Sequence, residues 1–266
     1  MGWLAGTLLL GSRSLGLGVL VHDAAHYSLF TSRRANEWTG KWLFGSLPNV
    51  PYHAYRAGHL SHHRMAGTAE DPDLAFVDSY PANRWSMARK LLRDVSGING
   101  VKNLAYQVAN FRLKDQLPFL VSHAMLVGAL VAFGHIGVYA CWWLGQIFVL
   151  PAVMRLRVMG EHGAVKDHFS SDPRANTSTT RAGPIARLLC APNFVNFHVE
   201  HHFAPGVPSY RLRHLHRLLK SRGCYDGWDC EASSYAAVIK RCTLPAGSRG
   251  TQHGHRRAKG ALSNMQ

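Results

Sequence analysis

The chain has 266 residues, of which 47% are apolar and 17% are charged, a composition that excludes an intrinsically disordered protein. Two classes remain, a globular enzyme and a membrane protein. The net charge of +15 allows a nucleic-acid partner, an anionic membrane surface or an acidic substrate. Five dispersed cysteines without a CxxC pair exclude a disulfide scaffold, whereas 17 histidines indicate a nitrogen-ligated metal site.

The first apolar window covers residues 3–21 and contains Arg13 as its only charge. Nineteen residues suffice for a helix to cross about 30 Å of hydrocarbon. A secretory signal peptide is the alternative, but the window lacks a basic leading segment and an A-x-A cleavage site. We therefore predict a membrane span in which Arg13 either reaches the interface or faces a polar partner inside the bundle.

Two further windows, 118–134 and 136–154, contain no Asp, Glu, Lys or Arg and are separated by a very short turn. They predict a transmembrane hairpin. Residues 38–50 are apolar but too few to span and include Lys41, which predicts an interfacial or re-entrant helix. The expected fold is an all-α integral-membrane bundle of three to four spans with a cytoplasmic helical cap.

The positive-inside rule orients this bundle. Two crossings separate residues 22–117 from residues 155–266, so both segments lie on one side, and they hold 12 and 17 basic residues. We expect that side to be cytoplasmic, in a bacterial inner membrane, with basic residues against anionic membrane lipid. No recognisable nucleic-acid module is present, so no nucleic-acid partner is expected. Residues 1–242 are predicted to form one membrane domain, and 243–266 a disordered tail.

Three histidine clusters stand out, and we call them box one, box two and box three. On a helix, positions i, i+3 and i+4 share a face, so each box can direct its imidazoles to one place. Random placement of 17 histidines would give far fewer than one HxxHH pattern, and the chain has two, which argues against ordinary core or surface histidines. The boxes are His22 and His26; His59, His62 and His63; and His198, His201 and His202.

The predicted topology brings all three boxes to one membrane face. Eight imidazoles exceed the four ligands of a tetrahedral zinc and suit two metals with open coordination positions, with two irons as the preferred count. A carboxylate-bridged di-iron bundle would instead show Glu-x-x-His pairs, and this sequence has none.

These motifs and their placement around a membrane hairpin resemble the integral-membrane fatty acid desaturase and hydroxylase superfamily. The resemblance covers about residues 11–222 and includes GTAEDPDL after box two and PNFVNFHVEHHFAPG around box three. It implies a histidine-ligated non-haem di-iron centre with His162 as a ninth ligand, and it implies no catalytic residue beyond the ligands. Relatives generally have one more crossing before box one, so this is either a shortened member or a chain whose start has been lost.

The resemblance further implies an oxygen-dependent desaturase of a fatty-acyl or lipid-like substrate. The sequence contains no cytochrome b5 haem motif, dinucleotide-binding glycine motif or ferredoxin-type cysteine run, so electrons must come from an external ferredoxin or similar carrier with its reductase. A hydroxylase of an alkyl, carotenoid or sphingoid chain is the alternative. A zinc-dependent membrane hydrolase fits less well because it leaves most of the histidines unexplained.

Several polar residues lie close to the predicted ligands in sequence. Carboxylates beside ligands can accept the second ring N–H of a histidine. The alternative is a solvated surface position for Asp23, Glu161 and Glu200, and capping of the next helix for Asp71 and Asp73. The candidates are Asp23, Glu161, Glu200, Asp71 and Asp73, together with His216 as a near-site histidine. Trp142 and Trp143 are expected in an interfacial belt or in helix packing, with the lining of a substrate tunnel as the alternative.

Overall fold

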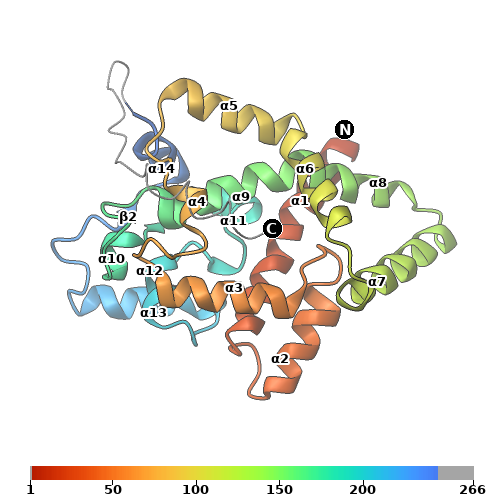
Figure 1. Cartoon of the computed structure of the whole chain (residues 1–266), viewed down its shortest axis with the longest axis horizontal. Helices are drawn as coiled ribbons and strands as arrows, with labels where there is room; N and C mark the ends of the chain where they lie inside the picture. The colour runs from red at the N-terminus through yellow and green to blue at the C-terminus, as the bar shows by residue number, and fades with distance from the viewer. Residues whose placement is uncertain (1, 245–266) are drawn as a thin grey trace, which may run out of the picture.

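The computed structural model describes residues 2–244, in which nearly all of the regular secondary structure is helical (Figure 1). The only strands in this range are the two-residue β1 (Thr179–Thr180) and β2 (Glu231–Ala232), which pair in parallel. The predicted all-α membrane bundle is confirmed. Residues 245–266, most of the predicted tail, lie outside the described range, and the single-domain boundary at 242 stays a prediction.

Three helices are long and apolar enough to cross a membrane, as predicted. They are α1 (Gly2–Ala25), α7 (Leu113–Ala132) and a continuous helix over Gly137–Gly163. The continuous helix consists of α8 (Gly137–Leu144), the π-helical η2 (Gly145–Val149), α9 (Leu150–Val158) and the π-helical η3 (Met159–Gly163). In Figure 1, α7 and α8 lie at one end of the molecule and α10, α12 and α13 at the other.

The third helix extends nine residues beyond its predicted end at residue 154. The prediction ended there because Arg155 and Arg157 interrupt the apolar pattern. Both arginines have carboxylate partners, since Arg155 pairs with the buried Asp94 and the Arg157 Nε lies 2.6 Å from Glu161 Oε1. The helix therefore continues to η3, which contains His162.

Glycines allow α1 and the third helix to approach closely. A Cβ atom added at Gly11 would lie 2.7 Å from the Val149 Cβ and 2.8 Å from the Gly145 carbonyl oxygen. Packing of this kind between small residues drives helix association in lipid, where burial of apolar surface gives no net gain. It fixes α1 against η2 and so positions the end of α1, which carries His22.

Arg13 is half-buried and has a polar partner, which agrees with one of its two predicted placements. Its guanidinium donates a hydrogen bond to the carbonyl oxygen of Leu188 in α11 (Pro184–Leu189). Next along the chain, η4 (Pro192–Phe194) packs beside α1, where the Asn193 side chain donates to the Gly16 carbonyl. These contacts fasten the cap to the middle of a span.

The short apolar segment predicted at 38–50 begins earlier and is helical only in part. Helix α2 (Arg33–Thr39) continues into the π-helical η1 (Gly40–Phe44), and turns follow to residue 50. The carbonyl oxygen of Leu47 lies 3.1 Å from Nε2 of His123, which is halfway along α7. Because α7 is a membrane-spanning helix, this contact favours the re-entrant alternative.

The cap carries boxes two and three on α3 (Tyr52–Met65) and α12 (His198–Phe203), and α13 (Ser209–Ser221) packs on α12. Buried Val77, Tyr80 and Val238 pack with Met159 of η3 in one apolar core. The remaining cap helices are α4 (Leu74–Val77), α10 (Pro173–Asn176) and α14 (Tyr235–Arg241). Two amphipathic helices, α5 (Arg84–Val95) and α6 (Ile98–Ala109), connect the cap to α7.

Candidate metal centre

Nine histidines gather at one end of the bundle in two groups, and they are the nine that sequence analysis singled out. In each group the ring nitrogens that could bind a metal lie within 4.8 Å of one another. The first group comprises His22, His26, His59, His63 and His201, and the second comprises His62, His162, His198 and His202. Their role as ligands remains a prediction.

Boxes two and three are each divided between the two groups. On α3, His59 and His63 are four residues apart and face the first group, while His62 turns to the second. On α12, His198 and His202 face the second group, while His201 turns to the first. Helical periodicity allows this division, because on the shared face residue i+4 lies to one side of residue i and residue i+3 to the other, so their rings can turn toward two neighbouring groups.

The Nε2 atoms of different elements converge within each group. In the first, His201 Nε2 lies 2.9 Å from both His22 Nε2 and His63 Nε2. In the second, His198 Nε2 lies 2.9 Å from His162 Nε2. Imidazole nitrogens directed at a common point form a donor set suited to first-row transition metals, so the residues fit a metal site.

The Nδ1 atoms of several histidines have partners outside the groups. His62 Nδ1 lies 2.8 Å from Asp71 Oδ1, and His22 Nδ1 lies 3.0 Å from Asp23 Oδ1. His162 Nδ1 lies 3.1 Å from the carbonyl oxygen of Asn176. Such contacts fix the tautomer and orientation of a ligating ring. The predicted role of Asp71 and Asp23 beside ligands therefore agrees with their geometry.

Asp23 also connects two elements, because its Oδ2 accepts hydrogen bonds from the backbone N–H and the hydroxyl of Ser209 at 2.9 and 2.7 Å. Ser209 is the first residue of α13, so this carboxylate holds α13 against the end of α1. Nothing in the local sequence of Ser209 indicates this role.

The two glutamates differ from the expectation. Glu161 Oε1 pairs with Arg157 and lies 3.6 Å from Nδ1 of His198, which places it at the edge of the second group. Glu200 is fully buried, and its carboxylate contacts no box histidine. It accepts hydrogen bonds from Thr179 and Tyr225 and lies 2.5 Å from Nδ1 of His216. His216 therefore lies near the site, where it contacts Glu200 of α12.

The sequence did not indicate a role for Thr179, Tyr225 or Asn176, because these are common residue types that lie far from the boxes in the chain.

Burial keeps most of the box histidines neutral in the absence of metal. It lowers the pKa of His26 to about 4 and that of His63 to about 3, and it lowers the pKa of His59, His201 and His202 well below the usual range. A neutral imidazole is the form that binds metals.

His62 behaves differently from the other box histidines of α3. Burial lowers its pKa, but the hydrogen bond to Asp71 and the negative charge of that carboxylate outweigh burial, and the net pKa is raised. Asp71 accordingly has a lowered pKa because its contact with His62 outweighs its own partial burial.

Three apolar helices and two histidine groups at the end of two of them are typical of an integral-membrane helical protein with a metal site. The sequence profile of fatty acid desaturases matches residues 1–228. The chain therefore belongs to the fatty acid desaturase family and is a membrane-type, desaturase-like oxidoreductase.

Three relatives illustrate the range of this family. Dihydrorhizobitoxine desaturase of Bradyrhizobium elkanii is 26% identical over 87% of this chain and 71% of its own length. A beta-carotene ketolase of Paracoccus sp. (strain PC1) is 30% identical over 75% of this chain and 73% of its own length. The sn-1 oleoyl-lipid 12-desaturase of a Picosynechococcus species is 26% identical over 80% and 67%, respectively.

Proposed function

We propose that the protein is an oxygen-dependent di-iron desaturase that introduces a double bond into a lipid-like chain. The observation that supports this most strongly is the convergence of nine histidines into two adjacent groups at the end of two apolar helices. The first group would hold one iron and the second group the other. When bound, such an iron pair supplies the activation of dioxygen and the removal of hydrogen from an unactivated C–H bond.

The protein's own residues would orient the centre and exclude water. Asp71, Asp23 and the Asn176 carbonyl hold three of the rings by their outer nitrogens. The site histidines are buried or half-buried, so a substrate methylene held beside them would be shielded from solvent, which protects a reactive centre from side reactions. The names of the relatives favour a long apolar substrate that enters from the bilayer.

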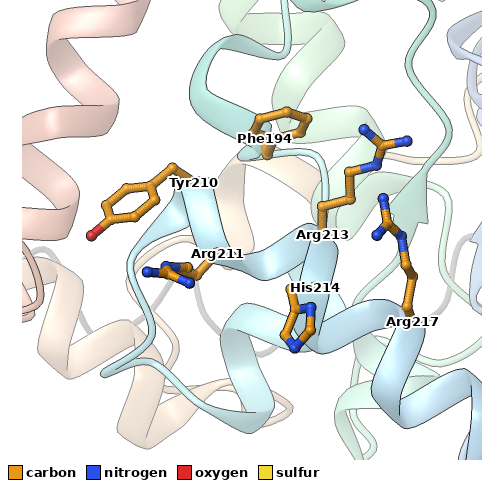
Figure 2. Close-up of a pocket in the computed structure, with 6 residues that line it drawn as sticks. All are labelled: Phe194, Tyr210, Arg211, Arg213, His214 and Arg217. Carbon is orange, nitrogen blue, oxygen red and sulfur yellow. The ribbon is translucent and has the colours of Figure 1, made fainter.

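We further propose that an acidic electron-donor protein docks on α13, on the cytoplasmic face of a bacterial inner membrane. An open groove of about 420 Å³ is lined by Phe194, Tyr210, His214 and three arginines. Figure 2 shows Arg213 and Arg217 beside each other on one face of α13, with Arg211 and His214 on another part of its exposed surface. None of the three arginines pairs with a carboxylate of the described residues, whereas nearby Lys220 pairs with Glu231.

The position of this groove supports electron delivery. The inner face of α13 carries His216, which contacts Glu200 of α12 between the box-three histidines. A docked donor would therefore be separated from the second histidine group by one helix. Complementary charge mainly raises the rate of association, and salt reduces it.

Reconstitution with ferredoxin, its reductase and NAD(P)H tests the reaction. Dioxygen should be consumed only when a lipid substrate is present, and the product should be two hydrogens lighter than the substrate. A product one oxygen heavier would indicate the hydroxylase alternative, for which the ketolase relative is the supporting observation. Anaerobic release of a hydrolysed ester or amide would instead identify a zinc hydrolase.

Metal analysis of purified variants tests the two-site assignment. The wild-type protein should hold close to two irons per chain. His26→Ala and His202→Ala, one from each group, should each reduce the iron content by about one and abolish turnover. His53→Ala is the matched control, because His53 is exposed on the same helix as box two and belongs to neither group. Zinc in place of iron, with full activity after iron removal, would contradict the assignment.

A further inference from the structure

A partly open cavity of about 60 Å³ lies away from the two histidine groups, between α6, the turn before α3 and the third span. Its polar lining residues are amides and indoles, including Asn49, Asn103, Gln107 and Gln146. No acidic or basic residue and no histidine lines it. Polar groups inside a membrane bundle are unfavourable unless they are paired, and they commonly mark sites of function.

Two hydrogen-bond donors at this cavity have no partner. Trp142 is only 6% exposed, and its Nε1 is buried without an acceptor. One turn further on, Gln146 Nε2 is also buried and unpaired, while Gln146 Oε1 accepts a hydrogen bond of 3.0 Å from the hydroxyl of Ser14. A buried N–H without an acceptor is unfavourable, so two of them beside one cavity favour a ligand that supplies an acceptor.

The cavity lies deep in the bundle. Ser14, which fixes the Gln146 amide, precedes His22 by eight positions on α1, or about 12 Å at the rise of an α-helix. The Trp142 ring lies 6.5 Å from the ring of His123, in the middle of α7. A second cavity of about 80 Å³ shares Asn49 and Phe119 with the first and extends to Tyr52 at the start of α3, the helix of box two.

We propose that Trp142 and Gln146 form a binding site for a neutral oxygen, such as a keto, ether or hydroxyl group, carried by a long apolar molecule. A carboxylate or phosphate is disfavoured because the lining has no cation to compensate a buried negative charge. The volume of the cavity is about that of two water molecules, so the cavity can hold a functional group but not a whole chain.

Identification of this molecule as the substrate rests on the proposed function. The oxygen would then lie about 12 Å deeper along α1 than the histidines, by the same helical rise. The site would thereby select chains that carry an oxygen function remote from the reacting carbon. Trp142 and Gln146 would determine specificity without touching the reacting atoms.

Binding of matched probes to the full chain in detergent micelles tests the site. The probes are 2-undecanone and undecane, which differ by the carbonyl oxygen. In protein labelled with ¹⁵N-tryptophan, the ketone should shift the indole N–H resonance of Trp142 saturably, and undecane should not. The resonance is assigned by its loss in Trp142→Phe, which keeps an aromatic ring and removes the donor.

Trp142→Phe should weaken ketone binding roughly 3- to 10-fold, as expected for one neutral hydrogen bond, and leave undecane binding unchanged. Trp143→Phe is the matched control, since Trp143 lines the same cavity but its Nε1 is not among the buried, unpaired atoms. The proposal is overturned if both probes shift the resonance equally, if neither binds, or if Trp143→Phe has the same effect. If Trp143→Phe fails to fold, the comparison of the two probes on the wild-type protein and on Trp142→Phe remains decisive.

This readout requires neither iron nor dioxygen. If the ketone does not bind to a preparation that consumes dioxygen, only the inferred oxygen-binding site is refuted. If the ketone binds selectively to a preparation that never consumes dioxygen, only the proposed reaction is refuted.

Discussion

His62 belongs to a different histidine group from its neighbours on α3, His59 and His63. It is two percent exposed, and its ring turns from the first histidine group to the second, where Asp71 holds Nδ1. Asp71 also accepts a hydrogen bond from the backbone N–H of Asp73, so the loop after box two presents its carboxylate in a fixed direction. The DPDL sequence thus orients a histidine through one short loop.

Asp71→Ala should loosen the second group because His62 would lose the acceptor that orients it. Metal affinity is expected to fall about 10- to 100-fold, as is typical when a partner of a ligating histidine is removed. The measurement is metal content after dialysis against graded chelator. Asp78→Ala is the control, since Asp78 is exposed and contacts no box histidine. Equal metal retention by both variants would show that Asp71 does not orient a ligand.

At the level of elements, α1 has the central position. It contacts α8, η2, α9, η4, α11 and α3, and it ends with box one. Because the histidine groups combine residues from α1, α3, η3 and α12, a small shift of α1 against η2 would displace two histidines of the first group, His22 and the adjacent His26, at once. The close contact of Gly11 with Gly145 therefore helps to position the first histidine group, in addition to packing the two helices together.

Gly11→Ala should destabilise the protein, because the added methyl group would overlap Val149 and the Gly145 carbonyl. Overpacking of this kind costs about 1–3 kcal/mol. Gly18→Ala on the same helix has open space around its added Cβ and should be neutral or slightly stabilising, given the helix propensity of alanine. Thermal unfolding in detergent compares the two. An equal melting temperature for both variants would contradict the close approach of the helices.

At the level of the whole molecule, the basic charge lies on the histidine-bearing cap and not in the hairpin. The chain has two exposed arginine pairs with i, i+4 spacing. Substituting one pair or the other distinguishes docking of the donor on α13 from an effect of the protein's net charge on donor binding. Arg213 and Arg217 line the α13 groove, while Arg89 and Arg93 lie on α5. Both pairs are exposed and lack carboxylate partners within the described residues.

Arg213→Glu with Arg217→Glu should raise the KM for the electron donor at least several-fold and reduce its dependence on salt. Turnover driven by a small chemical reductant should be unchanged, because the histidines are not altered. Arg89→Glu with Arg93→Glu makes the same change in net charge on α5 and should leave the donor KM near the wild-type value. Steady-state kinetics over a range of ionic strength measures this difference. Identical behaviour of the two double variants would refute docking on α13.

The predicted orientation has its own test. Single cysteines at Ala69 and Ser221, both exposed on the cap, should react with a membrane-impermeant thiol reagent only when the cytoplasmic face is accessible. A cysteine at His135, in the turn between the second and third spans, should react only from the opposite face. Labelling of the two cap positions from different faces would contradict both the topology and a shared site.

The sequence by itself determined the three spans, the helical class and the eight box histidines, while the ninth histidine of the two groups, His162, was implied by the family resemblance. These features depend on local patterns, namely the length of apolar windows and the i, i+3, i+4 spacing of the boxes, which constrain structure within a few helical turns. Only the tertiary structure decided how the nine divide into groups of five and four, that Glu200 contacts Tyr225 and His216 rather than a box histidine, and that Leu188 accepts from Arg13. His22 and His201 meet across 179 positions of the chain. Contacts at that separation depend on how helices dock, and docking is set by packing at places such as Gly11 and Gly145, for which the local sequence carries no partner information.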